Sequence, residues 1–365
     1  MRILAFSAVL VVALAPSNAA TQQQPPLAGA SRPNLKVLQN LPESQLFPVM
    51  NLMANSLGVR CDFCHVQETP NLARTPSNMG GWVWARDDKE PKQKAREMMR
   101  MVLELNATRF AGEHKVTCYT CHNGSTKPAR LPPLPPPLAG SFKTAAPTPL
   151  PSIDRVWTDY VNAVGGAARV ALGNGTVYTG WNERPEGRYG KVEIVATPDR
   201  YRITVASGDT TISQGLDSAG VWVFANGTLQ RFADPANVAA MRRTAMRYRP
   251  LKDRPANLKV VGVERVGAHD AFVATTRIDS LTTLALYFDV VTGLLRRELR
   301  TTETLLLPLE EQIDYDDYRE VNGVQLPFQV RFSDGAAYST ITRNFTQIRH
   351  NVPVDSLLRP PAAPR

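Results

Sequence analysis

Cysteine is scarce in this chain: there are four in 365 residues, and all four belong to two copies of one pentapeptide. The copies are Cys61-Asp62-Phe63-Cys64-His65 and Cys118-Tyr119-Thr120-Cys121-His122. No cysteine is left for any other purpose, and none lies near the N-terminal apolar segment, which excludes a lipid anchor on a cysteine there. The interpretation of this sequence therefore depends on the two pentapeptides.

Long apolar runs are absent as well. Ile3–Ala15 is apolar but too short to span a membrane, and no later stretch has the pattern of a transmembrane segment. Met1-Arg2 before this run and the small residues after it complete the pattern of a secretory signal peptide over residues 1–20. We expect a periplasmic protein that is not transmembrane once the signal peptide is cleaved.

Catalytic and nucleic-acid signatures are also missing. The chain contains no nucleophile elbow, phosphate-binding loop or zincin motif. Its formal net charge of +9 comes from scattered Lys and Arg, so we expect no nucleic-acid partner. This charge either serves solubility or favours an acidic docking surface on a protein partner or an anionic membrane surface.

The pentapeptide pattern C-x-x-C-H is the attachment sequence of a c-type haem. Two thiols three positions apart form thioethers with the two vinyl groups of one porphyrin, and the next histidine lies under the iron as its proximal ligand. The sequence therefore predicts two covalently bound haem c groups, each with an iron. The predicted residues are Cys61, Cys64 and His65 for the first haem and Cys118, Cys121 and His122 for the second.

Two alternatives remain open for paired cysteines, namely a zinc site and a redox disulfide. A zinc ribbon usually separates its C-x-x-C pairs by about 15–20 residues, whereas the gap from Cys64 to Cys118 is far longer. A thioredoxin-type motif is normally a single copy near a βαβ pattern. Neither alternative explains why histidine follows both motifs in a chain with only five histidines.

Each pentapeptide follows a predicted helix that carries methionine. Apolar residues recur at helical spacing over Ser44–Leu57, and Gly58 ends that helix. A second helix is predicted over Pro91–Thr108, with Asp87-Asp88 as candidate caps. Thioether sulfur is a frequent sixth ligand of haem iron and raises its reduction potential, although methionine also fills cores well. The predicted apolar stripe of the second helix is Met98, Met101, Val102 and Leu105, with Met99 off the stripe.

From about Asn34 to Thr126 the chain resembles the haem-binding modules of the cytochrome c subunit of photosynthetic reaction centres. In that family the sixth ligand is a methionine on the helix before each motif. The resemblance implies Met50 for the first haem and Met98 for the second, with Met101 in reserve. This chain has only two motifs, whereas the family's subunit carries four haems. The matching stretches are Pro48-Val49-Met50, Leu57–Cys61, Met98–Val102 and Val116–His122.

Three further residues of this region have open roles. His114 is an alternative iron ligand or an exposed loop residue. Trp82 and Trp84 either pack on a porphyrin edge or are ordinary aromatic packing residues.

After a proline-rich stretch, short alternating runs with recurring turn signals predict an antiparallel β-rich domain. We expect a curved sheet or partly open barrel of about ten strands with one helix, Pro235–Tyr248. The run Tyr315–Phe328 resembles the periplasmic lipoprotein-carrier and sorting family, whose open barrel holds acyl chains. That resemblance implies a lipid or quinone in the concavity, and the alternative is a docking or structural domain with a filled core.

The predicted fold class is therefore multidomain, with a small, mostly α-helical dihaem cytochrome c domain followed by the β-rich domain. The predicted parts are a signal peptide (1–20), a disordered segment (21–33), the dihaem domain (34–126), a proline-rich linker (127–152) and the β-rich domain (153–358).

We expect an electron carrier that relays single electrons between redox partner proteins, without substrate chemistry of its own. The alternatives are a dihaem peroxidase-type enzyme with one open haem and a haem-bearing carrier or sensor of a hydrophobic ligand.

Overall fold

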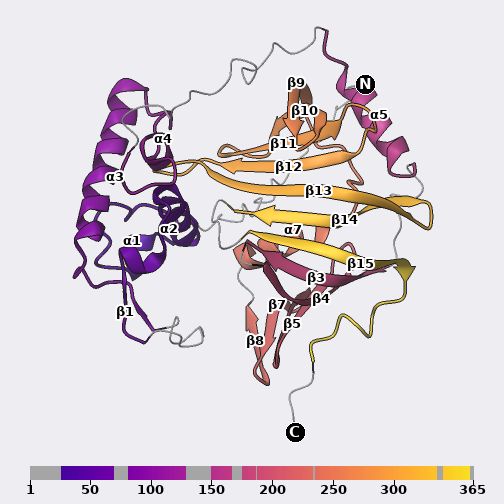
Figure 1. The fold of residues 1–365 in the computed structure, drawn as a ribbon, viewed down its shortest axis with the longest axis horizontal. Helices are drawn as coiled ribbons and strands as arrows, with labels where there is room; N and C mark the ends of the chain where they lie inside the picture. The colour runs from indigo at the N-terminus through magenta and orange to yellow at the C-terminus, as the bar shows by residue number, and fades with distance from the viewer. Residues whose placement is uncertain are drawn as a thin grey trace, which may run out of the picture.

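The computed structural model describes residues 26–69, 81–128, 149–166, 175–185, 187–232, 235–334 and 340–361. The predicted signal peptide and the proline-rich run of the linker lie outside the described residues. Within these ranges the chain forms a small helical region and a large β-rich region, which lie side by side (Figure 1). The predicted fold class is confirmed.

The helical region contains both pentapeptides. Its two long helices agree closely with the predicted ranges. The elements are α1 (Ala28–Ser31), α2 (Glu43–Leu57), the 3-10 turn η1 (Cys61–Phe63), the short strands β1 (Val66–Gln67) and β2 (Trp82–Val83), α3 (Glu90–Arg109) and α4 (Cys118–His122).

The start of α3 differs from the prediction. Lys89 occupies the N-cap position without a side-chain cap, and Pro91 lies in the first turn, where its missing N–H is not needed. The expected cap Asp87 does not bond to the helix N-terminus. It forms hydrogen bonds of 2.9 Å with the guanidinium of Arg96, which lies two turns inside the helix.

The segment predicted to be disordered over residues 21–33 is ordered from residue 26. The N–H of Ala28 donates to the carbonyl of Leu41 at 2.8 Å, and Leu27 forms a β-bridge with Pro42. Ala28 is completely buried, so its small apolar side chain holds this segment against the helical region. The polar, proline-rich composition of the segment predicts disorder instead.

The β-rich region is one antiparallel sheet of thirteen strands in the order β8-β7-β6-β5-β4-β3-β15-β14-β13-β12-β11-β10-β9. Two meanders, β3 to β8 and β9 to β15, meet where β15 pairs with β3, so the ends of the sheet are β8 and β9 and the sheet is not closed. The strands are β3 (Gly175–Arg184), β4 (Gly187–Ala196), β5 (Tyr201–Ser207), β6 (Thr210–Asp217), β7 (Gly220–Ala225), β8 (Thr228–Phe232), β9 (Lys259–Val266), β10 (His269–Arg277), β11 (Thr282–Asp289), β12 (Leu295–Thr302), β13 (Leu309–Val321), β14 (Val324–Ser333) and β15 (Ile341–Val352).

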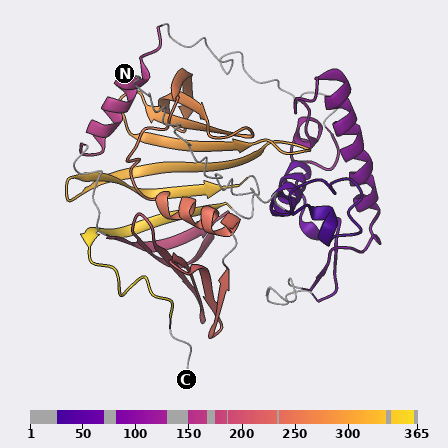
Figure 2. The same cartoon turned by 180° about the vertical axis from the view of Figure 1, so that it is seen from behind.

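Two helices accompany the sheet. The predicted one is α7 (Pro235–Met246), which lies behind the sheet in Figure 1 and in front of it in Figure 2. The second, α5 (Ile153–Ala163), was not predicted, although Ser152 caps it and Val156 and Tyr160 give it a buried face. It lies at the end of the sheet away from the helical region (Figure 2).

The inner face of the sheet is filled by side chains. Val156 and Tyr160 of α5 and residues from most strands form one hydrophobic cluster. Its largest members include tyrosines that are almost completely buried. Two of their hydroxyls form hydrogen bonds with the backbone. Tyr178 donates to the Tyr248 carbonyl at 2.7 Å, and Tyr160 accepts from the N–H of Leu251 at 2.6 Å. The apolar core is therefore formed by the protein's own residues.

Candidate haem site

The first pentapeptide lies directly after α2. That helix ends because Gly58 adopts the left-handed conformation, with φ +65°. Cys61–Phe63 then forms η1, in which the N–H groups of Cys64 and His65 both donate to the carbonyl of Cys61, at 3.3 and 2.9 Å. This single helical turn directs both thiols and the imidazole toward the same space, because all three side chains line one cavity.

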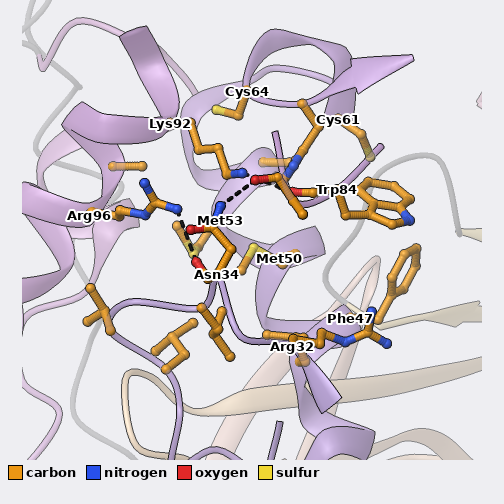
Figure 3. Close-up of a pocket in the computed structure, with 18 of the residues that line it drawn as sticks. Arg32, Asn34, Phe47, Met50, Met53, Cys61, Cys64, Trp84, Lys92 and Arg96 are labelled. Atoms are coloured by element: carbon orange, nitrogen blue, oxygen red, sulfur yellow. Dashed lines mark hydrogen bonds between the residues drawn. The ribbon is translucent and has the colours of Figure 1, made fainter. Parts of the chain in front are cut away.

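That cavity has a volume of about 500 Å³, within the range of small-molecule and cofactor sites (Figure 3). Its walls come from α2, the segment 31–38, the turn at 82–85 and α3. Three methionines line it, namely Met50 and Met53 one turn apart on α2, and Met99 on α3. Thioether sulfurs and the two thiols therefore share one largely apolar space.

The cysteines are free thiols in both pentapeptides. Burial raises the pKa of Cys64, with the nearby Lys89 opposing the effect, and burial also raises the pKa of Cys118. Both thiols are partly shielded from water, and neither forms a disulfide among the described residues.

His65 is held as a neutral imidazole. Burial lowers its pKa, the positive charge of Lys92 lowers it further, and a hydrogen bond with the backbone of Trp84 opposes both effects. Its Nδ1 atom is buried and has no hydrogen-bond partner. A neutral imidazole with a buried, unpartnered nitrogen has the protonation state that a metal ligand requires.

Aromatic rings pack around His65. The Trp84 ring lies edge-on to the imidazole, with centroids 5.1 Å apart, and stacks on Trp82 at 4.9 Å with an interplanar angle of 14°. Phe47 of α2 contacts the other side of Trp84 edge-on at 6.4 Å. Both tryptophans line the first cavity, so the predicted alternatives of a porphyrin edge and ordinary aromatic packing both remain open.

An ion-paired cluster stands at one wall of the cavity. Asp87 bonds to Arg96 and to Lys92, whose ammonium also donates to the Trp84 carbonyl at 2.9 Å. Hydrogen bonds from Arg96 and Lys92 hold the pKa of Asp87 well below its usual range. Arg96 also donates to the Asn34 carbonyl at 3.2 Å, so the cluster ties the turn beside His65 to α3 and to the N-terminal segment (Figure 3).

The second pentapeptide forms α4 itself. Thr117 and Thr120 make a reciprocal capping box at its N-terminus. Asn106 of α3 is buried and exchanges two hydrogen bonds with the backbone of Val116, at 2.7 and 3.0 Å, which fixes the segment before Cys118 against α3. The Nδ1 atom of His122 bonds to the carbonyl of Ser125 at 2.9 Å. Because a carbonyl only accepts, Nδ1 carries the proton, and the lone pair of Nε2 is left for a metal.

The two pentapeptides are held next to each other through the end of α2. The N–H of Gly124, two residues after His122, donates to the carbonyl of Ser56 at 2.9 Å. Three residues before Cys61, Gly58 packs so closely on Gly124 that a Cβ atom there would overlap the Gly124 carbonyl. Both motifs are thus anchored to one backbone contact.

The predicted apolar stripe of α3 does not coincide with the buried face of the helix. Its buried positions are Arg96, Met99, Val102 and Asn106. Two of these are polar residues with specific partners, so apolar periodicity alone indicated the wrong face. Met98 is half-buried and does not line the first cavity, and Met101 is 47% exposed.

His114 does not line the first cavity. Its Nδ1 is 2.8 Å from a carboxylate oxygen of Glu303, and its Nε2 is 3.3 Å from the carbonyl of Leu305, both in the β-rich region. It is therefore a contact between the two regions rather than an exposed loop residue. Two contributors to the site were missed from the sequence, namely the cavity-lining Met53 and Met99. For Met53, its spacing of three residues from Met50 was an available signal.

Among the residues that the structure describes, no three His, Cys, Asp or Glu side chains form a metal-binding group. The described helices include none that is long and apolar enough to cross a membrane.

Residues 8–132, about a third of the chain, match the family described as photosynthetic reaction centre cytochrome C subunit. This match covers both pentapeptides. It confirms the resemblance that the residues around them indicated. The C-x-x-C-H chemistry, the shared cavity and the neutral imidazole fit a haem c group at this segment, with the paired thiols and histidine as its attachment residues.

Three solved structures are similar to the C-terminal part of this chain. One is a DUF1329 family protein from Desulfovibrio piger, 12% identical, covering 56% of this chain and 99% of its own, with a TM-score of 0.38. A LolA superfamily protein from Nitrosomonas europaea is 10% identical over 58% of this chain and 99% of its own, also at 0.38. An outer membrane lipoprotein-sorting protein domain from Vibrio parahaemolyticus is 9% identical over 53% and 90%, at 0.35.

Proposed function

We propose that this protein is an exported dihaem c-type cytochrome that relays single electrons between redox partners. The observation that carries the proposal is the first cavity, where the Cys61 and Cys64 thiols and the neutral His65 share one apolar space with the thioether of Met50. Bound haem c supplies a one-electron iron couple whose potential is set by axial ligands, burial and hydrogen bonds.

In the first site, the roles divide by residue. Cys61 and Cys64 would attach the porphyrin covalently, and His65 and Met50 would supply the ligands of its iron. Met50 is the preferred iron ligand among the three cavity methionines. Met53 and Met99 are more than nine-tenths buried within a hydrophobic cluster, whereas Met50 is only partly buried. A closed sixth position favours electron transfer over substrate binding at the metal.

In the second site, Cys118 and Cys121 attach the porphyrin and His122 supplies the proximal nitrogen. The bond from His122 to Ser125 supports this role because it orients the ring and fixes its tautomer. Met98 is the proposed sixth ligand, since it is half-buried and lies outside the first cavity, and the exposed Met101 is the reserve.

The β-rich region is proposed to serve docking and structure. Its inner face is occupied by the protein's own apolar and tyrosine side chains, which supports this role over a lipid or quinone carrier. Extraction of purified protein with organic solvent tests the alternative: a stoichiometric lipid or quinone in the extract would favour the carrier hypothesis.

The partner surface is proposed to be the basic rim of the first cavity. Lys36 and Arg60 are both exposed and both line it. We expect oxidation by ferricyanide, a small anionic probe, to slow as ionic strength rises and to slow in a Lys36→Glu/Arg60→Glu variant. Oxidation by a neutral reagent is the control and should change little.

An optical redox titration of the full-length holoprotein tests the proposed function. We expect two one-electron steps, low-spin spectra in both states and no carbon monoxide binding to the reduced protein. Rapid carbon monoxide binding to one reduced iron would favour the peroxidase-type alternative, because it requires an open coordination position.

A further inference from the structure

One loop of the β-rich region is packed into the helical region. It joins β12 to β13 through residues 303–308 and reaches from the sheet to the helices in both views of the fold (Figures 1 and 2). At its tip, Leu306 and Leu307 have exposed fractions of 0% and 1%. Because these side chains project from a surface loop of the sheet, only the helical region can bury them so completely.

The hydrophobic cluster that receives this loop also forms the wall of the first cavity. Leu306 and Leu307 belong to the same cluster as Leu38, Val49 and Val102, and as Met53 and Met99, which line the cavity. Met50 packs against this cluster from the cavity side. The methionine wall of the cavity thus belongs to a cluster that includes two leucines from the other region of the protein. Cys118 of the second pentapeptide packs against the same cluster.

The loop has a defined shape. The hydroxyl of Thr304 donates to the carbonyl of Leu307 at 2.6 Å and accepts from the N–H groups of Leu306 and Leu307. Glu303 is tied to the sheet by its own N–H, which donates to the Leu281 carbonyl at 2.9 Å. The two leucines are therefore presented by a closed turn rather than by a flexible tip.

A polar contact fixes the same loop to the helical region from the side. Each ring nitrogen of His114 faces an acceptor, the Glu303 carboxylate at 2.8 Å and the Leu305 carbonyl at 3.3 Å. The loop is thus held by an apolar tip and a polar flank.

We infer that the loop at 303–308 is a positioning element of the first haem site, and that Leu306 and Leu307 set its reduction potential. They hold the methionine wall against the cavity and keep water out of it. Ligand geometry and solvent exposure around an iron–sulfur bond both control its potential. The inference rests on the proposed function, since it requires haem at Cys61 and Cys64.

The consequence is that the helical region is not an independent electron-carrier module. The β-rich region contributes to the chemistry of one haem and not only to docking.

The test compares Leu306→Ala and Leu307→Ala in the full-length holoprotein with Leu358→Ala. Leu358 is equally buried but packs on Val177 and Val195 at the far face of the sheet, so it controls for general loss of stability. A Cys118→Ser/Cys121→Ser variant, which keeps only the first motif, assigns the potentials. Peptide mass analysis first establishes whether Cys61 and Cys64 carry haem.

We expect the midpoint potential of the first haem to fall in both alanine variants, with weakening of the red charge-transfer band of methionine-ligated ferric iron. The Leu358→Ala protein should keep both potentials. Any shift of the second haem is measured separately, because Cys118 packs against the same cluster as the two leucines. If the alanine variants do not accumulate, Leu306→Val and Leu307→Val provide smaller changes, with smaller shifts in the same direction. If the loop variants fold and the potential of the first haem is unchanged, the inference is overturned but the proposed function is not. If Cys61 and Cys64 of the wild-type protein carry no haem, the proposed function is overturned as well.

Discussion

Gly58 and Gly124 touch through their backbones, and this contact brings the two haem-attachment motifs together. Gly58 has φ +65° and ends α2, and Gly124 has φ +81° just after α4. Since a side chain at Gly58 would overlap the Gly124 carbonyl, the chain needs glycine there both for conformation and for space. The relative placement of the two motifs therefore depends on this pair.

Gly58→Ala tests that dependence. The left-handed conformation alone costs an alanine about 1–3 kcal/mol, and the overlap with Gly124 adds to this cost. Gly112→Ala is the matched control, because Gly112 also has a left-handed φ, +84°, but its Cβ would meet open space. Urea unfolding should show the larger loss for Gly58→Ala; equal losses would mean that the contact is unimportant.

Met50→Leu tests the proposed sixth ligand. Leucine preserves the apolar volume but has no sulfur, so the first iron should lose its methionine charge-transfer band, fall in potential and bind carbon monoxide when reduced. Met101→Leu, at a position that is 47% exposed and outside the first cavity, should leave these properties of the first iron unchanged. An unaltered spectrum in the Met50→Leu protein would exclude Met50 as a ligand. Met53 and Met99 would then be the remaining candidates.

Arg96→Ala tests the ion-paired wall of the first cavity. Arg96 is buried and bonds to Asp87, Gln93 and the Asn34 carbonyl, so its loss removes charge-assisted hydrogen bonds, at a cost of about 1–3 kcal/mol. Lys94→Ala removes only an exposed pair with Glu97 and should cost less than about 0.5 kcal/mol. Chemical denaturation of the two variants checks this, and similar losses would show that the cluster contributes little.

Asp314 should make the β-rich region sensitive to acid. Burial acts to raise its pKa, but hydrogen bonds from Arg297 and Arg331 outweigh this and hold it below the ordinary value. A carboxylate with a lowered folded-state pKa stabilises the fold above its unfolded pKa of about 4, and this stability is lost as pH falls through the folded-state value. The free energy of unfolding should therefore fall below about pH 4 in the wild type.

Asp314→Asn should reduce that pH dependence and lower stability at neutral pH. Asp209→Asn, in the exposed turn between β5 and β6, provides the comparison. Denaturation curves at several pH values measure both effects. An Asp314→Asn protein with the wild-type acid profile would show that other groups control the transition.

The pair His114 and Glu303 should couple the two regions. A double-mutant cycle with His114→Gln and Glu303→Gln isolates their interaction, which we expect to be about 0.2–1 kcal/mol because Glu303 is half-exposed. The cycle is measured by urea unfolding of the full chain. A coupling of zero would mean that the apolar tip of the loop alone holds the regions together.

The local sequence predicts those parts of the site that depend on short-range spacing. The C-x-x-C-H turns and the helix ending at Gly58 follow from residues a few positions apart. Alternating runs and turn pairs likewise predict the antiparallel sheet. Each of these signals requires only the periodicity or conformation of the local chain.

What could not be predicted depends on partners distant in sequence. Asn106 and Arg96 occupy the buried face of α3 because Val116 and Asp87 satisfy them, so hydrophobicity alone selects the wrong face. Leu306 lies in an irregular loop, and nothing nearby in sequence indicates that it enters the helical region. The order within the sheet, with β15 beside β3, is similarly a long-range pairing.

The central claim is that both C-x-x-C-H turns hold haem covalently. Proteolysis of acid-extracted polypeptide followed by mass analysis tests it most directly. The account predicts two haem-bearing peptides, one with Cys61 and Cys64 and the other with Cys118 and Cys121. Unmodified peptides with four alkylatable thiols from a colourless polypeptide would contradict it.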